Sequence, residues 1–154
     1  MKRLLRWLAT FGPVGYCPLA PATAGSAVVA VLGYFTPAPP LWVALVLILV
    51  GGWLAVGVCG AAEHQLGHDA KPIVADEAVG QSLALLKVPH DPAAFAVAFL
   101  LFRLFDVWKP LGAREAQRLP GGLGVVTDDV IAGLTACATF HLGIWGARAA
   151  GWAR

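Results

Sequence analysis

Five of the nine acidic residues in this 154-residue chain stand in three short blocks. The blocks are Asp76 with Glu77, Asp106 alone, and Asp128 with Asp129. Hard cations such as Mg²⁺ prefer carboxylate oxygens, and acids from several helices can share one ion when the fold brings them to one level. The pattern therefore predicts an Mg²⁺ site built from all five residues, and an ion held there can bind a phosphate group.

Each acidic block also has a structural interpretation that involves no metal. Asp76 with Glu77, or the later pair, can cap a helix and favour the positive end of its dipole. Asp106 is expected at a helix C-terminus, where the helix dipole opposes negative charge, so capping does not explain it. The alternative to a metal-binding role is an i,i+3 ion pair with Arg103. The residues alone leave these interpretations open.

Two basic residues flank the single aspartate. Arg103 lies three positions before Asp106, and Lys109 lies three positions after it. A guanidinium fork or an ammonium can neutralise a transferring phosphoryl group, so both residues are predicted to be catalytic and to bind substrate. Anchoring at lipid headgroups is the alternative role.

Small residues complete the predicted substrate site. Thr23 and Ser26 can bind phosphate at a helix N-terminus, although helix capping accounts for them equally well. A flexible glycine-rich turn before the last helix is expected to present backbone N–H groups to an anion. Its glycines are Gly121, Gly122 and Gly124.

Gly80 lies one helical turn after Asp76 and Glu77. Glycine costs about 1 kcal/mol relative to alanine inside a helix, so this position needs a reason for it. Close helix packing and a catalytic requirement are equally good explanations.

Other metal-binding and nucleophilic sites are not favoured. The histidine pair at i,i+4 lacks the central glutamate of a zincin helix, so a solvated loop is expected for that segment. The segment holds Glu63, His64, His68 and Asp69. His90 and His141 stand apart and are expected to be structural.

The three cysteines are Cys17, Cys59 and Cys137. They are too far apart for a disulfide framework or a zinc site, and each is expected to be buried. None is followed six positions later by arginine, which excludes a cysteine phosphatase.

The elements that position these residues must suit a lipid solvent. Apolar residues make up 58% of the chain and charged residues 13%, against about 25% charged in soluble proteins. Too little polar surface remains to cover a water-soluble globule. A net charge of +2, with dispersed basic residues, argues against nucleic acid. A single integral membrane domain spanning residues 1–154 is expected, with no prediction of oligomeric state.

Apolar runs and prolines predict an all-α membrane helical bundle of about five hydrophobic helices in hairpins. The longest run, 41–60, matches a hydrocarbon core of roughly 30 Å at about 1.5 Å per residue. Asp91 and Pro92 predict a helix start, and prolines separate the first two helices. The third and fourth helices are short for a full crossing. The expected helices are 26–35, 41–60, 76–86, 93–105 and 130–147.

Helical hairpins return the chain to the side it left, so all the acidic blocks are expected at one end of the bundle. Most lysines and arginines fall at the same end, and the positive-inside bias makes that end cytoplasmic. Lys2, Arg3 and Arg6 beside Trp7 predict an interfacial N-terminal helix, because no apolar segment suitable for a signal peptide follows. A multi-pass protein of the inner (cytoplasmic) membrane is therefore expected.

Three segments resemble motifs of the phosphatidylglycerophosphatase A family, bacterial membrane phosphatases that depend on Mg²⁺. Residues 15–26 (GYCPLAPATAGS) resemble its first motif, residues 73–80 (IVADEAVG) its second and residues 102–133 its third, while Ala22 and Gln117 depart from the pattern. The resemblance implies hydrolysis of phosphatidylglycerophosphate to phosphatidylglycerol and inorganic phosphate, a step of glycerophospholipid biosynthesis. The functional residues it implies are Asp69, Asp76, Glu77, Gly80, Arg103, Asp106, Lys109, Gly121, Gly122, Gly124, Asp128 and Asp129.

Two other functions and two mechanisms stay open. A metal-dependent phosphatidyl-group transferase also uses membrane-embedded acids, although its DG…AR…G…D…D spacing is absent. The second of these functions is that of a non-enzymatic cation-binding membrane component, although acids at helix ends disfavour an ion path through the bilayer. Hydrolysis can proceed by attack of water or through an aspartyl-phosphate at Asp106, Asp128 or Asp129.

Overall fold

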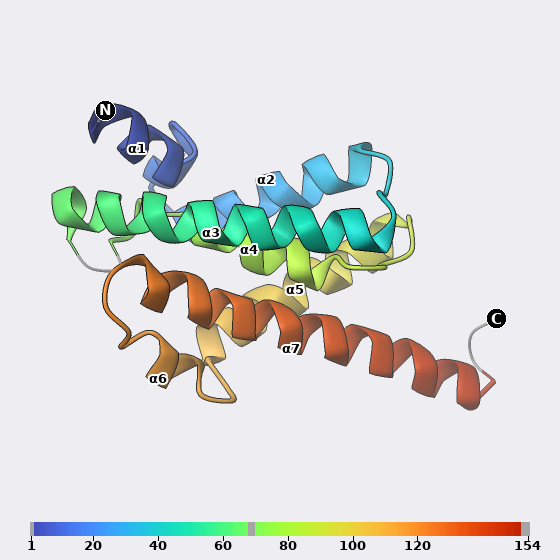
Figure 1. Cartoon of the computed structure of the whole chain (residues 1–154). Coiled ribbons are helices and arrows are strands. Elements are labelled where there is room, and N and C mark those ends of the chain that lie inside the picture. Colours follow the sequence, from blue (N-terminus) through green and yellow to red (C-terminus); the bar gives the residue numbers. More distant parts are fainter. Residues whose placement is uncertain (1, 68–69, 152–154) are drawn as a thin grey trace.

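The computed structural model describes residues 2–67 and 70–151, and all regular structure in them is helical (Figure 1). These residues contain no strand, which confirms the predicted all-α class. His68 and Asp69, both considered above as metal ligands, lie outside the described residues. The helices are α1 (Lys2–Ala9), the 3₁₀ helix η1 (Val14–Tyr16), α2 (Pro21–Phe35), α3 (Leu41–Leu66), α4 (Ala75–Ala84), α5 (Pro92–Trp108), α6 (Ala113–Ala116) and α7 (Gly122–Ala149).

Prolines set several helix boundaries, as the sequence predicts. α2 begins at Pro21 and α5 at Pro92, in the first turn, where the missing N–H of proline leaves no intrahelical hydrogen bond unmade. The Asp91 carboxylate caps α5 by accepting a hydrogen bond from the N–H of Ala94 at 2.9 Å. The predicted helix start at Asp91 and Pro92 is confirmed.

Four helices are longer than the sequence predicts. α2 begins more than a turn before Ser26, α3 continues past Gly60, α5 continues past Phe105 to Trp108, and α7 begins well before Asp128. The expected loop at Glu63 and His64 is wrong, since both residues lie in the last turns of α3. Ser26, Gly60 and Asp128, expected at or next to helix ends, are therefore interior residues of α2, α3 and α7.

Two helices of the described residues, α3 and α7, are long and apolar enough to cross a membrane, with 26 and 28 residues. α4 has 10 residues. At about 1.5 Å per residue it spans roughly 15 Å, about half of a hydrocarbon core. The bundle therefore has two candidate membrane spans, and the expected five are not confirmed.

α4 forms the centre of the bundle and packs against α2, α3, α5 and α7 (Figure 1). Eight of its ten residues are buried. A Cβ on Gly80 would lie 2.5 Å from the Phe102 ring and 2.6 Å from the carbonyl oxygen of Asp129, and Gly133 of α7 faces the carbonyl of Gly80. Close helix packing therefore explains Gly80, and this packing draws α4, α5 and α7 together.

α2, α4 and α7 begin, and α3 and α5 end, at one end of the bundle, which we call the acidic end (Figure 1). A Cβ on Gly25 of α2 would touch Val74, which precedes α4. A Cβ on Gly60 of α3 would lie 3.2 Å from the backbone nitrogen of Gly122, at the start of α7. Residues far apart in the sequence thus lie at the same level.

The predicted N-terminal helix is present as α1, which packs on α3. Leu4 and Trp7 of α1 are exposed. The side-chain amide of Gln65 donates a hydrogen bond to the carbonyl of Lys2 at 3.3 Å and links the two helices. An interfacial position for α1 stays a prediction.

All three cysteines are free thiols, in agreement with the absence of a predicted disulfide. Cys59 is buried, as expected. Cys17 and Cys137 are only partly buried, which corrects the expectation for those two.

Candidate active site

Three carboxylates from three helices converge at the acidic end. Glu77 lies in the first turn of α4, Asp106 in the last turn of α5, and Asp129 two turns into α7. One carboxylate oxygen of each residue lies within 4.8 Å of those of the other two. The predicted convergence of the acidic blocks is confirmed for these three residues, which we call the carboxylate triad.

The triad fits a hard divalent cation. Glu77 is 6% exposed and Asp129 is 3% exposed, and Oδ2 of Asp129 has no hydrogen-bond partner among the described residues. Burial, followed by the charges of Asp106 and Asp76, raises the pKa of Glu77 well above its usual value. A cation between the carboxylates would relieve this repulsion and give Asp129 a partner. Three carboxylate oxygens are the type of ligand that Mg²⁺ prefers.

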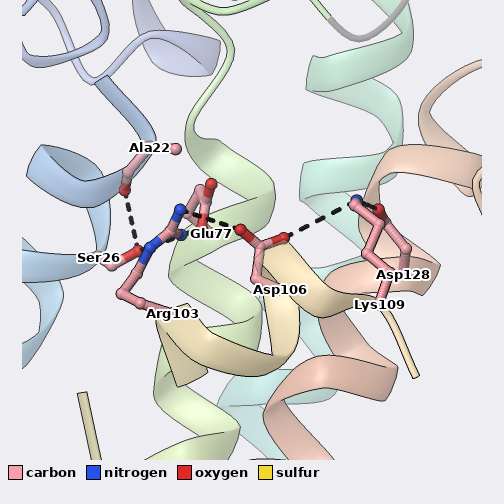
Figure 2. Close-up of polar contacts among 7 residues, drawn as sticks. All are labelled: Ala22, Ser26, Glu77, Arg103, Asp106, Lys109 and Asp128. Carbon is pink, nitrogen blue, oxygen red and sulfur yellow. Dashed lines mark hydrogen bonds and ion pairs between the residues drawn. The ribbon is translucent and has the colours of Figure 1, made fainter. Parts of the chain in front are cut away.

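Arg103 links two members of the triad, as Figure 2 shows. Its guanidinium binds Glu77 and also Asp106, the latter at 2.9 Å. The same guanidinium donates a hydrogen bond to the hydroxyl of Ser26 at 3.2 Å. The expected i,i+3 ion pair with Asp106 is present, but Arg103 does more than stabilise α5, because it joins α2, α4 and α5 at the triad.

Lys109 approaches the triad from the other side (Figure 2). It ends α5 in the left-handed conformation (φ 51°), and its ammonium binds Asp128 and lies 3.9 Å from Asp106. Burial lowers the pKa of Lys109, but the hydrogen bond to Asp128 and the charges of Asp128, Asp106 and Asp129 outweigh it and raise the pKa. The side chain therefore stays cationic at neutral pH.

Asp76 and Asp128 were predicted as metal ligands together with the triad, and both are buried beside it. Asp128 binds Lys109, while Asp76 adds negative charge next to Glu77. Helix capping does not explain Asp128 and Asp129, because both lie inside α7. Asp76 and Glu77 lie in the first turn of α4, where the helix dipole favours negative charge. The five predicted acids thus divide into a triad and two flanking carboxylates.

Comparison with known proteins identifies the family. The sequence profile of the family described as Phosphatidylglycerophosphatase A matches residues 7–144. The chain belongs to this family. It is accordingly a phosphatase, and the family together with two long apolar helices indicates a lipid phosphate substrate and membrane association.

Three curated relatives cover most of the chain. A protein of Bacteroides thetaiotaomicron named "Putative phosphatidylinositol-3-phosphatase" is 35% identical over 78% of this chain and 80% of its own length. Phosphatidylglycerophosphatase A of Escherichia coli K12 is 32% identical over 78% and 72%, respectively. Phosphatidylglycerophosphatase A of Haemophilus influenzae is 34% identical over 76% and 74%. No solved structure matches the chain.

In this phosphatidylglycerophosphatase A family member, the three motif-like segments meet at the acidic end. Ser26 comes from the first segment, Glu77 from the second and Arg103 from the third, and their side chains contact one another. Asp106 and Asp129 of the third segment complete the triad. Segments that are separated in the sequence by tens of residues therefore form one polar site.

The two predicted hydroxyl residues have different positions. Ser26 is fully buried, and its hydroxyl lies 2.9 Å from the carbonyl oxygen of Ala22 and 3.1 Å from the Glu77 carboxylate (Figure 2). It lies inside α2, so it does not cap that helix. Thr23 lies in the first turn of α2, about one turn before Ser26, and is partly buried. The structure thus joins Ser26 to the triad through Glu77.

Of the three glycines expected in a turn before the last helix, only Gly121 lies there, and their binding of an anion stays a prediction. Gly122 and Gly124 lie in the first turn of α7, and Gly121 precedes it with φ 59°. A Cβ on Gly122 would collide with the carbonyl oxygen of Val56 in α3, and one on Gly124 would lie 2.5 Å from the carbonyl oxygen of Leu119. Close packing of α7 against α3 and the preceding loop explains both helical glycines.

Gln81, for which the sequence predicts no role, lies one helical turn after Glu77 on the same face of α4. Gln81 is fully buried, and neither of its amide atoms has a hydrogen-bond partner among the described residues. Buried polar atoms are normally paired. Its spacing of four from Glu77 was a signal that the polar interior extends one turn deeper than the triad.

Proposed function

We propose that the chain hydrolyses the terminal phosphate monoester of phosphatidylglycerophosphate in an Mg²⁺-dependent reaction that yields phosphatidylglycerol and inorganic phosphate. The observation that carries the proposal is the carboxylate triad, with Glu77 and Asp129 buried and Asp106 partly buried, flanked by Arg103 and Lys109 in a member of the phosphatidylglycerophosphatase A family. Two relatives, 32% and 34% identical, carry the name of this activity.

Glu77, Asp106 and Asp129 would hold the ion through one oxygen each. When bound, Mg²⁺ supplies neutralisation of phosphate charge and activation of the attacking group. Arg103 fixes the positions of Glu77 and Asp106, and Lys109 brings a second positive charge to the same site. Two fixed cations beside an anionic substrate are suited to stabilising the charge that develops on the transferred phosphoryl group.

The site would lie at the cytoplasmic face of a bacterial inner membrane, with α3 and α7 crossing the bilayer. α4 is too short to cross and is enclosed by its neighbours. Positively charged residues gather at the acidic end, and the positive-inside bias then orients this end to the cytoplasm. The segments that join α3 to α4 and α5 to α7 at the acidic end carry Lys71, Lys109, Arg114 and Arg118. α1, which packs on α3 and bonds to Gln65 near the end of α3, carries Lys2, Arg3 and Arg6. At the other end lie Lys87, which follows α4, and Arg148, in the last turn of α7.

The test is release of inorganic phosphate from phosphatidylglycerophosphate in detergent micelles by the purified full chain, with Mg²⁺ or with EDTA. We expect phosphate release with Mg²⁺ and loss of release in EDTA. Absence of phosphate release in both conditions would contradict the proposed hydrolysis, and joining of two substrates would indicate a transferase. Phosphate release that persists in EDTA would contradict the role of the metal.

A second candidate substrate is phosphatidylinositol 3-phosphate, because the relative that is 35% identical carries the name of that activity. Both lipids present a phosphate monoester on a polar headgroup, so the triad could act on either. Comparing kcat/KM for the two lipids in the same micelles distinguishes them. A higher value for phosphatidylglycerophosphate is expected, and a higher value for the inositol lipid would reassign the substrate.

A further inference from the structure

An apolar groove of about 280 Å³ runs between α2 and α5. Its walls include Ala27, Ala30 and Val31 of α2 and Pro92, Ala96 and Phe99 of α5. Val31 and Ala96 are exposed on the surface of the bundle. We call this feature the α2–α5 groove.

One end of the α2–α5 groove lies next to the candidate active site. Ala30 follows Ser26 by four residues, and Phe99 precedes Arg103 by four, so each lies one turn away on the same face of its helix. The Ser26 hydroxyl and the Arg103 guanidinium are themselves joined by a hydrogen bond of 3.2 Å. One end of the α2–α5 groove therefore lies one helical turn from the hydrogen bond between Ser26 and Arg103.

Aromatic rings mark the other end. The Tyr34 ring stacks on His90 with centroids 4.5 Å apart and meets the edge of Phe95 at 5.3 Å. A ring nitrogen of His90 lies 2.6 Å from the carbonyl oxygen of Tyr34, which gives the histidine the structural role expected for it. From Ser26 to Tyr34 the helix rises roughly 12 Å at about 1.5 Å per residue, so the groove leads from the polar site toward the hydrocarbon region.

Two other apolar grooves differ in their relation to the site. One lies between α1, α3 and α4, and another between α3, α4 and α7. Both have α3 as one wall, and α3 supplies no residue of the site. Their α4 and α7 walls belong to the helices that supply Glu77 and Asp129, but neither helix supplies Ser26 or Arg103. The walls of the α2–α5 groove, in contrast, are the two helices that supply Ser26 and Arg103.

We propose that the α2–α5 groove holds an acyl chain of the lipid phosphate while its phosphate lies at the triad, an inference that rests on the proposed function. Lipid tails are as apolar as the groove, so entry of a chain gains little hydrophobic free energy. The benefit is positional, because a chain seated between α2 and α5 restrains the headgroup beside Arg103. A lipid can enter sideways from the bilayer, since the groove opens on the surface of the bundle.

The first test fills the groove with Val31→Trp on one wall and Ala96→Trp on the other. For each variant, kcat/KM is measured for long-chain phosphatidylglycerophosphate and for its deacylated headgroup, glycerophosphoglycerophosphate, in the same micelles. The ratio of kcat/KM for the lipid to kcat/KM for the headgroup should fall by about tenfold. Misplacing a substrate by less than about 1 Å has effects of this order.

Neighbouring exposed residues provide matched controls. Leu32→Trp and Val97→Trp place the same side chain on the same helices at positions that do not line the groove, and their ratios should equal that of the wild-type protein. An unchanged ratio in both groove variants, or an equal change in the controls, would overturn the acyl-chain proposal. A wild-type protein that releases no phosphate from the lipid would instead refute the proposed function.

A second test uses only the wild-type protein and so does not depend on folding of variants. A phosphatidylglycerophosphate with a photoreactive diazirine in one acyl chain is activated, and the labelled peptides are mapped by mass spectrometry. Labels should concentrate on residues 27–35 and 92–99, and unlabelled phosphatidylglycerophosphate should compete where phosphatidylcholine does not. Labelling of α2 and α5 that is no stronger than that of α3, or that the unlabelled lipid phosphate does not reduce, would overturn the proposal.

Discussion

α3 and α4 pack against each other, yet they have opposite relations to their surroundings. α3 has 26 residues with apolar side chains directed outward, such as Trp53, which is 79% exposed. α4 has ten residues, eight of them buried, and these include Asp76, Glu77 and Gln81. In this bundle the most hydrophobic helix faces the surroundings, while the shorter and more polar helix forms the core. A lipid solvent favours this arrangement, because exposing apolar side chains to lipid costs no free energy of hydration, whereas polar groups need hydrogen-bond or charge partners inside the bundle.

The largest expected effect comes from changing the polar interior. Asp129→Asn removes one negative charge from the triad and should lower kcat/KM for lipid phosphate hydrolysis by about 10²- to 10³-fold, the effect typical of losing one group that stabilises transition-state charge. Asp106→Asn should act similarly. Helix content measured by circular dichroism should remain that of the wild-type protein in both variants.

Asp91→Asn is the control for these changes, because Asp91 caps α5 outside the acidic end and asparagine is also a good N-cap. Its activity should stay close to that of the wild-type protein. Equal activity in the Asp129, Asp106 and Asp91 variants would reject the assignment of the triad as the site of chemistry.

Mg²⁺ should stabilise the interior of the bundle. A ligand that binds only the folded state adds about 2.7 kcal/mol at roughly 100 times its Kd, so Mg²⁺ should raise the Tm of the wild-type protein. The shift should disappear in Asp129→Asn and persist in Asp91→Asn. Thermal unfolding in detergent followed by tryptophan fluorescence measures it, and an equal shift in all three proteins would place the ion elsewhere.

Glycines in α3 and α4 should respond oppositely to alanine. Gly80→Ala puts a methyl group against the Phe102 ring and the Asp129 carbonyl, and overpacking of this kind costs about 1–3 kcal/mol. Gly57 of α3 has nothing within 4 Å of the added Cβ, so Gly57→Ala should stabilise the protein by roughly 0.5–1 kcal/mol through helix propensity. Chemical denaturation of both variants measures the two free energies, and destabilisation of similar size at both positions would argue against a tightly packed α4.

The sequence predicts the type of element and the residue types of the site better than it predicts boundaries and partners. Prolines and apolar runs locate the helices because their effects are local, and Asp91 with Pro92 marks the start of α5 correctly. The start of α7 is missed because glycine is a poor helix former, and only the fold shows that Gly122 and Gly124 lie in a helix where a Cβ would collide with α3 or the preceding loop.

Partner choice within the site depends on three dimensions. Five acids are evident in the sequence, but their division follows from helix packing. Gly80 and Gly133 draw α4 and α7 together, so Glu77 and Asp129 meet. Asp128 binds Lys109 instead, although it is the residue directly before Asp129 in the chain. Residues adjacent along a helix point about 100° apart, and no spacing rule indicates which of the two faces the ion.

The smallest expected effect concerns the hydroxyl at the edge of the triad. Ser26→Ala removes an acceptor for Arg103 and a donor for Glu77 while Arg103 keeps its bonds to both carboxylates. The loss should be about 1 kcal/mol, or roughly fivefold in kcat/KM, because a hydrogen bond has a net value of this order and the two charged partners stay paired with each other. Thr36→Ala is the matched change on the exposed end of α2, where the hydroxyl bonds only to backbone carbonyls of its own helix, and it should leave activity unaltered. Steady-state kinetics on the two variants decides the matter. Equal losses of activity in Ser26→Ala and Thr36→Ala would contradict this prediction, because Ser26 would then affect the reaction no more than a hydroxyl far from the triad.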